Sequence, residues 1–574
     1  MIDTLPKRDT NERLRNDMWR ACDILRRDNN VGGILQYTEH LAWLLFLKFM
    51  DEEEKRRVEL ALLGGEPYEP VLHGDLAWDF WASPKALEKS SASELIQFVR
   101  GRLLPGLAGL TGSPLAYTIA GMFSDESTGD QNIVRAVPVC ASGYNLKDVL
   151  EIINSIFFDR QSDLFTIALF YEDLLERMSG ENRTAGEFHT PRPVIRFMID
   201  VIAPQIGETI YDPAYGSAGF LVQAFQFMRP FARTIEENRY LHEQTFFGVE
   251  KKAISALLGT MNMVLHGVNA PKLLRANTLE ESIKGDVAQR YDIVLTNPPF
   301  GGTEGAHIQQ NFAIKANATE LLFLQHIIKK LKRAPNARAA IVVPEGTLFR
   351  GGAFAEVKKD LLRQFHQFAV VSLPPGTFAP YSDVKTALLF FKRPDEVLEQ
   401  NPLAREETWF YELPLPERLK KFSKGSRIAD SHFDEARTLW AAWRAYLSGK
   451  GERPFAYASN LRPQRQSPVK TKPVQQSLFE DTQPITRVWE KPVVYEQTAD
   501  PPFVTNTNTW IEQVDDLAAR DYDLSARNPH RGDERRSEPP AVLTARLLER
   551  SRELHSLIES LHAKLSNGEG EREE

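Results

Sequence analysis

The chain has 574 residues, of which 42% are hydrophobic and 26% charged, and this composition excludes collagen-like and wholly disordered proteins. Only two cysteines are present, Cys22 and Cys140, which excludes a disulfide framework and a four-cysteine zinc site. Its 70 Lys and Arg against 78 Asp and Glu give a net charge of −8, so binding to nucleic acid requires a local basic face or a partner.

The ends and apolar stretches of the chain indicate its compartment. The N-terminal stretch is polar and charged, unlike a secretory signal. The longest dense apolar run, residues 41–47, is far shorter than the ~20 residues that a membrane helix needs. With so few cysteines as well, we expect a cytoplasmic protein that makes no membrane contact.

Residues 1–160 are expected to form an all-α N-terminal domain. Apolar residues recur with a helical period over residues 13–27. Thr38 precedes a second, longer helical pattern that runs through Trp43 and Met50 and ends in the charged run DEEEKRR, residues 51–57. We interpret that run as the solvated end of the helix.

Residues 161–455 alternate short apolar strands with helices, which predicts an α/β catalytic domain whose mostly parallel sheet is covered on both faces. The last two strands are joined without a helix, which predicts an antiparallel hairpin at the sheet edge. The expected strands are 209–211, 246–250, 291–296, 339–343, 369–373 and 386–391, and helices are expected over 219–228 and 253–265.

Residues 456–510 are rich in Pro, Gln and Lys without periodicity, and we interpret them as a linker or mobile insertion. The string QQSLF, residues 475–479, resembles a peptide that docks on the bacterial sliding clamp, although a chance occurrence is the favoured interpretation. Residues 511–574 are expected to return to helix. Heptad positions there hold Leu543, Leu547, Leu554, Leu557 and Leu561, which favours docking on a partner helix over packing on the chain's own domain.

The strongest chemical signal is Asn297-Pro298-Pro299-Phe300, directly after the strand expected at 291–296. Proline ends a strand, and open α/β sheets carry their sites at the carboxyl ends of strands. The Asn297 side-chain oxygen and the Pro298 carbonyl can each accept one N–H of an exocyclic amine such as adenine N6, directing its lone pair at an electrophile. Phe300 can stack on the base. A purely structural alternative, a strand-ending turn with a buried Phe, is less favoured once the next motif is considered.

That second motif is Asp212-Pro-Ala-Tyr-Gly-Ser-Ala-Gly-Phe220, which follows the strand expected at 209–211 and opens a helix. Its glycines permit a tight turn and close approach of backbone amides to a ligand. The dinucleotide pattern G-x-G-x-x-G and the phosphate-binding G-x-x-x-x-G-K-[ST] loop are both absent, which counts against NAD enzymes and P-loop enzymes.

Polar residues also mark the ends of the next strands. Glu250 ends the strand expected at 246–250, the position that usually holds a ribose diol, and Asn277 stands at the following strand tip. For each residue an ordinary exposed strand end remains an alternative. Upstream lies GEFHTPR, residues 186–192, where His189 taken alone is more often a packing or surface residue. No cluster has metal-ligand spacing, so we expect no catalytic metal.

Taken in order, GEFHTPR, DPAYGSAGF, GVE and NPPF resemble the γ-class amino-methyltransferases that use S-adenosylmethionine, and more narrowly the modification (M) subunit of type I restriction–modification systems. A DYDLSARN string at residues 521–528 is also typical, so the resemblance covers nearly the whole chain. It implies a Rossmann-like methyltransferase fold and transfer of a methyl group to N6 of an adenine flipped out of DNA.

The resemblance also implies roles for individual residues, with Asn297 to Phe300 holding the flipped adenine. His189 stands where the family often has Tyr or Phe, and Asn277 where an acidic residue is frequent, which puts those two contacts in doubt. The implied cofactor-binding residues are Glu187, Phe188, His189, Thr190, Pro191, Arg192, Asp212, Ala214, Gly216, Ser217, Ala218, Gly219, Glu250 and Asn277.

The implied partners are DNA and a specificity subunit that reads the sequence, with two copies of this chain per specificity subunit. A motor-nuclease restriction subunit can join them. Two alternatives stay open. The same NPP[FY] chemistry serves methyltransferases of ribosomal RNA and of protein glutamine, and a non-catalytic scaffold could have inherited the fold.

Overall fold

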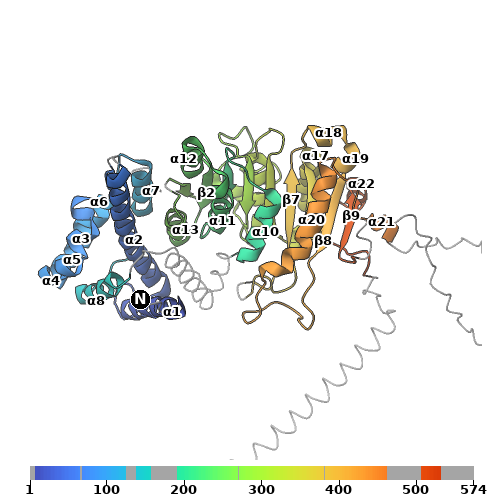
Figure 1. The fold of residues 1–574 in the computed structure, drawn as a ribbon. Helices are drawn as coiled ribbons and strands as arrows, with labels where there is room; N and C mark the ends of the chain where they lie inside the picture. Colours follow the sequence, from blue (N-terminus) through green and yellow to red (C-terminus); the bar gives the residue numbers. More distant parts are fainter. Residues whose placement is uncertain are drawn as a thin grey trace, which may run out of the picture.

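A computed structural model describes residues 7–64, 68–124, 137–156, 190–268, 270–379, 382–461 and 506–531. They form a helical part, drawn in blue in Figure 1, beside a sheet-containing part that carries the rest of the described chain. The sequence stretches 475–479 and 541–574, and three residues expected in the cofactor site, Glu187, Phe188 and His189, lie outside the described residues. No helix in the described ranges is long and apolar enough to cross a membrane.

The N-terminal part is helical throughout its secondary-structure elements, as expected. Its long central helix α2 begins at Ile34, so Thr38 lies inside it and donates its hydroxyl hydrogen to the Ile34 carbonyl at 2.6 Å. One face of α2 is fully buried, with Trp43 and Phe46 at its centre. The helices are α1 (Lys7–Leu25), α2 (Ile34–Gly64), α3 (Trp78–Trp81), α4 (Pro84–Lys89), α5 (Ala92–Phe98), α6 (Leu104–Ala108), α7 (Pro114–Phe123) and α8 (Gly143–Asn154).

The charged run 51–57 is not the solvated helix end that its composition predicts. It lies in the interior of α2, and two of its acids, Asp51 and Glu54, are buried. The Glu54 carboxylate accepts a hydrogen bond from the Leu72 backbone amide at 2.9 Å. Burial raises the pKa of Glu54, and the backbone amides at Val71 and Leu72 oppose that rise. The run therefore fixes the returning chain against the helix.

The second part is built on one nine-stranded sheet in the order β3-β2-β1-β4-β5-β7-β6-β8-β9. Most neighbouring pairs are parallel, as expected, and Ile210 of β1 pairs with both Phe246 of β2 and Ile293 of β4. The strands are β1 (Ile210–Asp212), β2 (Phe246–Glu250), β3 (Lys272–Arg275), β4 (Ile293–Thr296), β5 (Arg338–Pro344), β6 (His366–Ser372), β7 (Thr386–Lys392), β8 (Glu407–Glu412) and β9 (Thr509–Gln513).

The expected hairpin of β6 and β7 is antiparallel, but it does not lie at the sheet edge. Strand β8 adds to β6 in parallel, and β9 then pairs antiparallel with β8, with Trp409 opposite Ile511. Residues 511–513, expected to be helical, therefore end a buried strand. The reason is burial: Trp510 and Ile511 are fully buried, which a strand in this sheet achieves by pairing across about 100 residues of sequence.

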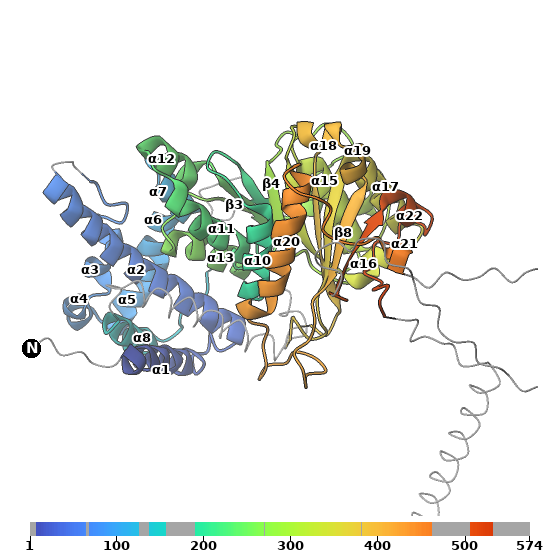
Figure 2. The same ribbon diagram turned by 45° about the vertical axis from the view of Figure 1, so that its right-hand side comes forward.

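Helices cover both faces of the sheet. On one face α10, α11, α13 and α20 pack around a core that includes Phe197 and Trp443, and on the other α15 and α17 pack against Val294 and Phe391. Figure 2 shows α10 and α20 lying side by side on the same face of the sheet. The longer helices are α10 (Arg192–Ile202), α11 (Gly219–Met228), α12 (Ile235–Glu243), α13 (Ala253–Leu265), α15 (Thr319–Lys330), α17 (Ala353–Gln364) and α20 (Asp434–Leu447), and the shorter ones are α14 (Ala306–Gln309), α16 (Glu345–Phe349), α18 (Glu396–Gln400), α19 (Pro402–Arg405), α21 (Ala458–Leu461) and α22 (Val514–Ala518).

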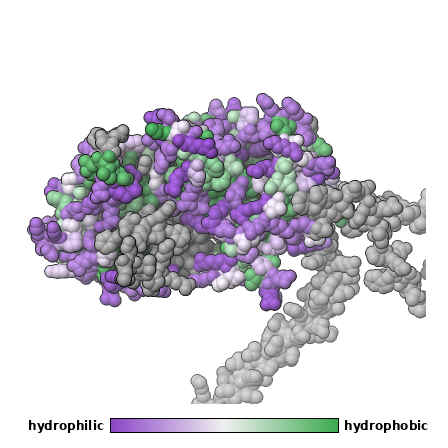
Figure 3. All heavy atoms as spheres, in the orientation of Figure 1, coloured by the Kyte–Doolittle hydropathy of each residue, from purple (hydrophilic) through white to green (hydrophobic). Residues whose placement is uncertain are grey.

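Helix α13 joins the two parts. Five of its residues, including Leu257 and Met261, belong to the core of the helical part, whereas Ala256 and Met263 belong to the core under the sheet. A helix that is apolar nearly all round is buried on two sides. On the face seen in Figure 3, hydrophilic residues predominate and apolar ones form small, separate patches.

Candidate active site

A small pocket lies where β1 and β4 end and helices α10 and α11 begin. It joins residues more than 100 positions apart, because the carboxyl ends of neighbouring parallel strands meet at one edge of the sheet. Eight of the lining residues were expected from the sequence: Thr190, Arg192, Asp212, Ala214, Gly216, Ser217, Gly219 and Asn297. The sequence reasoning missed Ile195, Tyr215 and Phe220 as lining residues.

Asn297 is the residue on which the chemistry depends. Its side-chain Nδ2 donates a hydrogen bond to the Thr190 hydroxyl oxygen at 2.9 Å, which fixes the orientation of the amide. Its Oδ1 is buried and has no hydrogen-bond partner among the residues that the structure describes. A buried acceptor without a donor costs about 1–3 kcal/mol, so such an atom in a pocket is a strong indication of a ligand donor. The amide is set to accept one N–H.

Phe300, three residues after Asn297, is half-buried. Its ring meets the ring of Phe378 edge-on, with centroids 6.3 Å apart and an interplanar angle of 81°. Phe378 belongs to the loop between β6 and β7 and is almost fully buried. The contact holds the Phe300 ring from one side, so its orientation does not depend on a ligand.

Asp212, the last residue of β1, is almost completely buried at 1% exposure. Its Oδ1 accepts hydrogen bonds from the Thr296 hydroxyl at 2.7 Å and from the Ala214 amide at 3.0 Å. The pKa of Asp212 is raised to about 7, chiefly by burial and also by the nearby Glu250 carboxylate, while the two hydrogen bonds oppose the rise. The hydrogen bond to Thr296 also ties the end of β1 to the residue before Asn297.

The glycine-rich turn after Asp212 is shaped by its neighbours. Gly216 and Ala218 both have a left-handed backbone, with φ of 51° and 59°. The Tyr215 ring fills the space over two glycines of other elements: a Cβ on Gly248 or on Gly259 would lie 2.7 Å from that ring. These two glycines are therefore required for the turn to approach β2 and α13 closely.

Glu250 ends β2 and holds the same turn in place. Its Oε2 accepts from the Gly216 amide at 3.0 Å and its Oε1 from the Lys252 amide at 2.8 Å. These two bonds fix the Glu250 carboxylate at the end of the strand, beside the glycine-rich turn. Arg192 donates from Nη1 to the Gly219 carbonyl at 3.3 Å and so connects α10 to the start of α11.

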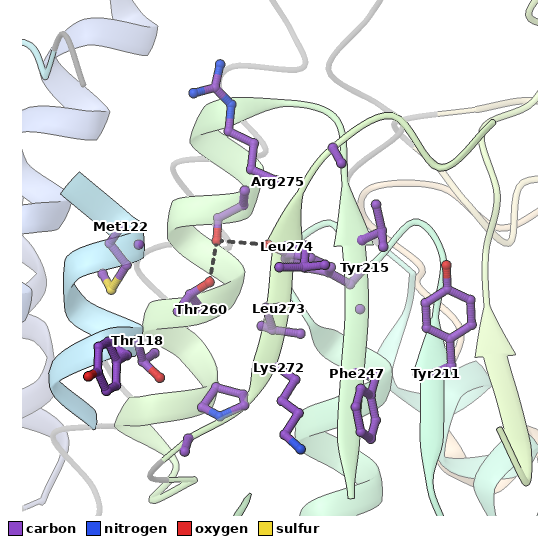
Figure 4. A pocket seen from close by; sticks show the side chains of 18 of the residues that line it. Thr118, Met122, Tyr211, Tyr215, Phe247, Thr260, Lys272, Leu273, Leu274 and Arg275 are labelled. Carbon is purple, nitrogen blue, oxygen red and sulfur yellow. Dashed lines mark hydrogen bonds between the residues drawn. The ribbon is translucent and has the colours of Figure 1, made fainter. Parts of the chain in front are cut away.

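Asn277 does not line the small pocket. Its side chain caps the short helical turn after β3, accepting from the Leu279 amide at 3.3 Å. It lines a larger groove of about 1090 Å³ between α7 of the helical part and strands β2 and β3. Figure 4 shows this groove with Lys272 beside Phe247, whose ring centroid lies 5.1 Å from the Lys272 Nζ.

The structure also brings together a Cys–His pair that the sequence did not reveal. Cys140 Sγ lies 3.3 Å from His40 Nε2 in the core of the helical part. Burial raises the pKa of the Cys140 thiol to about 12 and lowers the pKa of His40 to about 4. The thiol stays protonated and away from solvent, so the pair is structural. Within the described ranges, no three His, Cys, Asp or Glu side chains are grouped to hold a metal ion.

Comparison with known proteins identifies the family of the chain. Residues 160–462 match the N-6 DNA Methylase family and residues 14–153 match the HsdM N-terminal domain. The chain is 32% identical over 529 residues to the type I restriction enzyme EcoEI methylase subunit of Escherichia coli, covering 91% of each chain. It is 29% identical over 454 residues to the EcoKI methylase subunit of E. coli strain K12, covering 77% of this chain and 78% of that one.

A solved structure extends the similarity to three dimensions. A chain from a study of complex assembly and conformational transition in the type I R-M system aligns with a TM-score of 0.67 at 50% identity. The alignment covers 97% of this chain and 99% of that chain.

Proposed function

We propose, since this chain belongs to the N-6 DNA Methylase family, that it is the modification subunit of a type I restriction–modification system. It transfers a methyl group from S-adenosylmethionine to N6 of an adenine flipped out of duplex DNA. The observation that carries the proposal is the buried Asn297 Oδ1, which finds no hydrogen-bond donor in the described part of the chain and shares its pocket with the glycine-rich turn. We place the activity in the cytoplasm, where the duplex DNA is.

The lining of the pocket suits the methyl donor in its chemistry. Backbone amides at the turn and at the start of α11 lie against it, and the acids Asp212 and Glu250 lie at the adjoining strand ends. An electropositive sulfonium and an ammonium group are stabilised by buried carboxylates, and hydroxyls are bound by a carboxylate such as Glu250. When bound there, S-adenosylmethionine supplies the electrophilic methyl group.

The residues of the chain then act on the base. The Asn297 Oδ1 and the Pro298 carbonyl each accept one hydrogen of the adenine amine, which lets its nitrogen become more tetrahedral and directs its lone pair. The Thr190 hydroxyl keeps the amide in this orientation. Phe300 presents its free side to the base for stacking, a contact worth about 1–3 kcal/mol. The fixed acceptors need little reorganisation during transfer.

The test is methyl transfer to duplex DNA by the full chain with its specificity subunit. Asn297→Ala should abolish transfer while the affinity for S-adenosylmethionine, measured by calorimetry, stays nearly the same. Asn238→Ala, at a half-buried position on α12 that does not line the pocket, is the matched control and should methylate normally. Equal methylation by Asn297→Ala would remove Asn297 from the mechanism.

Two alternatives from the sequence remain distinguishable in the same assay. A substrate of ribosomal RNA or protein glutamine would give transfer to those substrates and none to duplex DNA. A non-catalytic scaffold would not bind S-adenosylmethionine at all. The match to the N-6 DNA Methylase family favours DNA as the substrate. So do the two relatives named as type I restriction enzyme methylase subunits, which align with this chain over 91% and 78% of their own length.

The assembly is also part of the proposal. Two copies of the chain act with one specificity subunit, and a restriction subunit can join them. The net charge of −8 supports a division of labour in which another chain supplies sequence recognition. Light scattering of the co-expressed proteins measures the stoichiometry, and a mass that requires one copy or four copies would contradict it.

A further inference from the structure

A basic arm connects β8 to α20. The arm, residues 416–428, contains five cationic side chains and one acidic one, although the whole chain carries a net charge of −8. All five cationic residues are exposed. In Figure 1 the arm projects below the sheet, on the side where helix α10 begins. The cationic residues are Arg418, Lys420, Lys421, Lys424 and Arg427.

The arm is anchored at its middle by close contact with the β6–β7 loop. Phe422, at its centre, is buried at 1% exposure, and its amide donates to the Pro375 carbonyl at 3.0 Å. A Cβ on Gly376 would lie 2.2 Å from the Phe422 carbonyl oxygen, so the arm and the β6–β7 loop are in close backbone contact. Beyond Phe422, Ser423 and Ser426 pair with each other and form a turn. The cationic residues therefore lie on both sides of a point that is fixed to the sheet.

The anchor leads directly to the predicted base site. The β6–β7 loop that holds Phe422 also carries Phe378, whose ring contacts Phe300 with centroids 6.3 Å apart. A single loop thus separates the arm from the residue that is proposed to stack on the adenine. A flipped base stays attached to its backbone, so the phosphates that flank it must pass near the mouth of this site.

Among the described residues, the nearby acids leave the charges of Lys420 and Lys421, the pair chosen for the test, largely accessible. Asp430, the first acid after the arm, is bound by Arg196 at 2.8 Å and lies 3.9 Å from Arg437. Asp383 of the β6–β7 loop faces Lys421 at 3.3 Å, with both side chains more than half exposed. An exposed pair of this kind contributes at most about 1 kcal/mol and is screened by salt.

We propose that this arm binds the phosphate backbone of duplex DNA beside the flipped adenine. The inference rests on the proposed function, because it takes DNA as the substrate. DNA presents one negative charge per about 1.7 Å, and each phosphate contact contributes about 0.9 to the slope of log affinity against log salt concentration. The arm gives the otherwise acidic chain its own contact with the DNA at the point of chemistry.

The test compares a double variant, Lys420→Gln with Lys421→Gln, with the wild-type complex of the full chain and its specificity subunit. Binding to a fluorescent duplex is measured between 0.05 and 0.3 M salt, a range on the order of that used for counterion-release analysis. The salt slope should become less steep by about 1.8, and affinity at 0.1 M salt should fall roughly 60-fold. The KM for DNA should rise while kcat stays near the wild-type value.

Two further variants serve as controls. Lys420→Arg with Lys421→Arg keeps the charge and should restore both the slope and the KM. Arg333→Gln with Arg363→Gln removes two exposed, similarly paired cations near the amino ends of β5 and β6, and should leave both unchanged. Thermal melting and S-adenosylmethionine affinity report whether each variant is folded.

The outcomes separate the arm from the function. An unchanged salt slope in a folded, active double variant overturns the arm proposal and leaves the methyltransferase proposal intact. Loss of co-elution with the specificity subunit, with an unchanged slope, also overturns it and identifies a protein-docking surface. Failure of the wild-type complex to methylate DNA contradicts the proposed function instead.

Discussion

The hydrogen bond between Thr190 and Asn297 allows a sharp test of the mechanism. Thr190→Val replaces the hydroxyl with a methyl group of nearly the same size and removes the only acceptor shown for the Asn297 Nδ2 among the described residues. The amide then has no partner to fix which end faces the base. If Nδ2 turns toward the adenine amine, two donors oppose each other.

The magnitude follows from the cost of one buried, unsatisfied donor. That cost is about 1–3 kcal/mol. If it is felt in the transition state, kcat should fall by about five- to 150-fold. The affinity for S-adenosylmethionine should change little, because the Asp212 and Glu250 contacts with the glycine-rich turn remain.

The assay is single-turnover methylation of duplex DNA, with the affinity for the methyl donor measured separately by calorimetry. Thr190→Ser keeps the hydroxyl and should retain most of the activity. A wild-type kcat for Thr190→Val would refute the orienting role of Thr190. A loss confined to the Ser variant, which keeps the hydroxyl but lacks the γ-methyl group, would show that packing of that methyl group, rather than the hydrogen bond, is what matters.

Three further predictions follow from the site and the C-terminus. Gly259→Ala places a Cβ 2.6 Å from the Gly216 carbonyl oxygen and so displaces the glycine-rich turn by a fraction of an ångström. The affinity for S-adenosylmethionine, measured by calorimetry, should therefore fall at least about tenfold. Gly285→Ala, which places its Cβ in open space, is the control and should be neutral. Because the pKa of Asp212 is raised from 3.8 to about 7 in the folded state, the native protein retains a proton that the unfolded chain loses between these pH values. As the pH rises from 3.8 to about 7, the free energy of unfolding of the wild type should therefore fall relative to that of Asp212→Asn, measured by urea titration. Parallel pH profiles of the two proteins would contradict this. Deleting residues 541–574 should weaken co-purification with the specificity subunit but spare cofactor affinity, and equal co-purification would exclude the docking role.

Local sequence patterns were sufficient for the elements that pack in sequence order. The strand expected at 246–250 and the helices expected at 219–228 and 253–265 have those bounds in the structure. Their periodicity and flanking glycines act within a few residues, so a single sequence displays them. The antiparallel pairing of β6 and β7 was likewise predictable, because no helix separates the two strands.

Patterns failed where distant segments decide burial. Strand β9 pairs with β8 across about 100 residues, and the residues between them gave no indication of that pairing. The run 51–57 was expected at a solvated helix end because its charge is high. In the fold, Glu54 is buried because the returning chain supplies amides at Val71 and Leu72.

The sequence by itself determined the family and the methyl donor through the order of its motifs, and it predicted the residues that face that donor, because those side chains are needed whatever the path of the intervening chain. Only the tertiary structure decided which atoms are committed and which are left for a ligand. It showed that Thr190 holds one end of the Asn297 amide and that no donor within the described ranges reaches the other end. Such an assignment depends on contacts made across 107 residues of sequence, and these exist only when the sheet has brought its strand ends together.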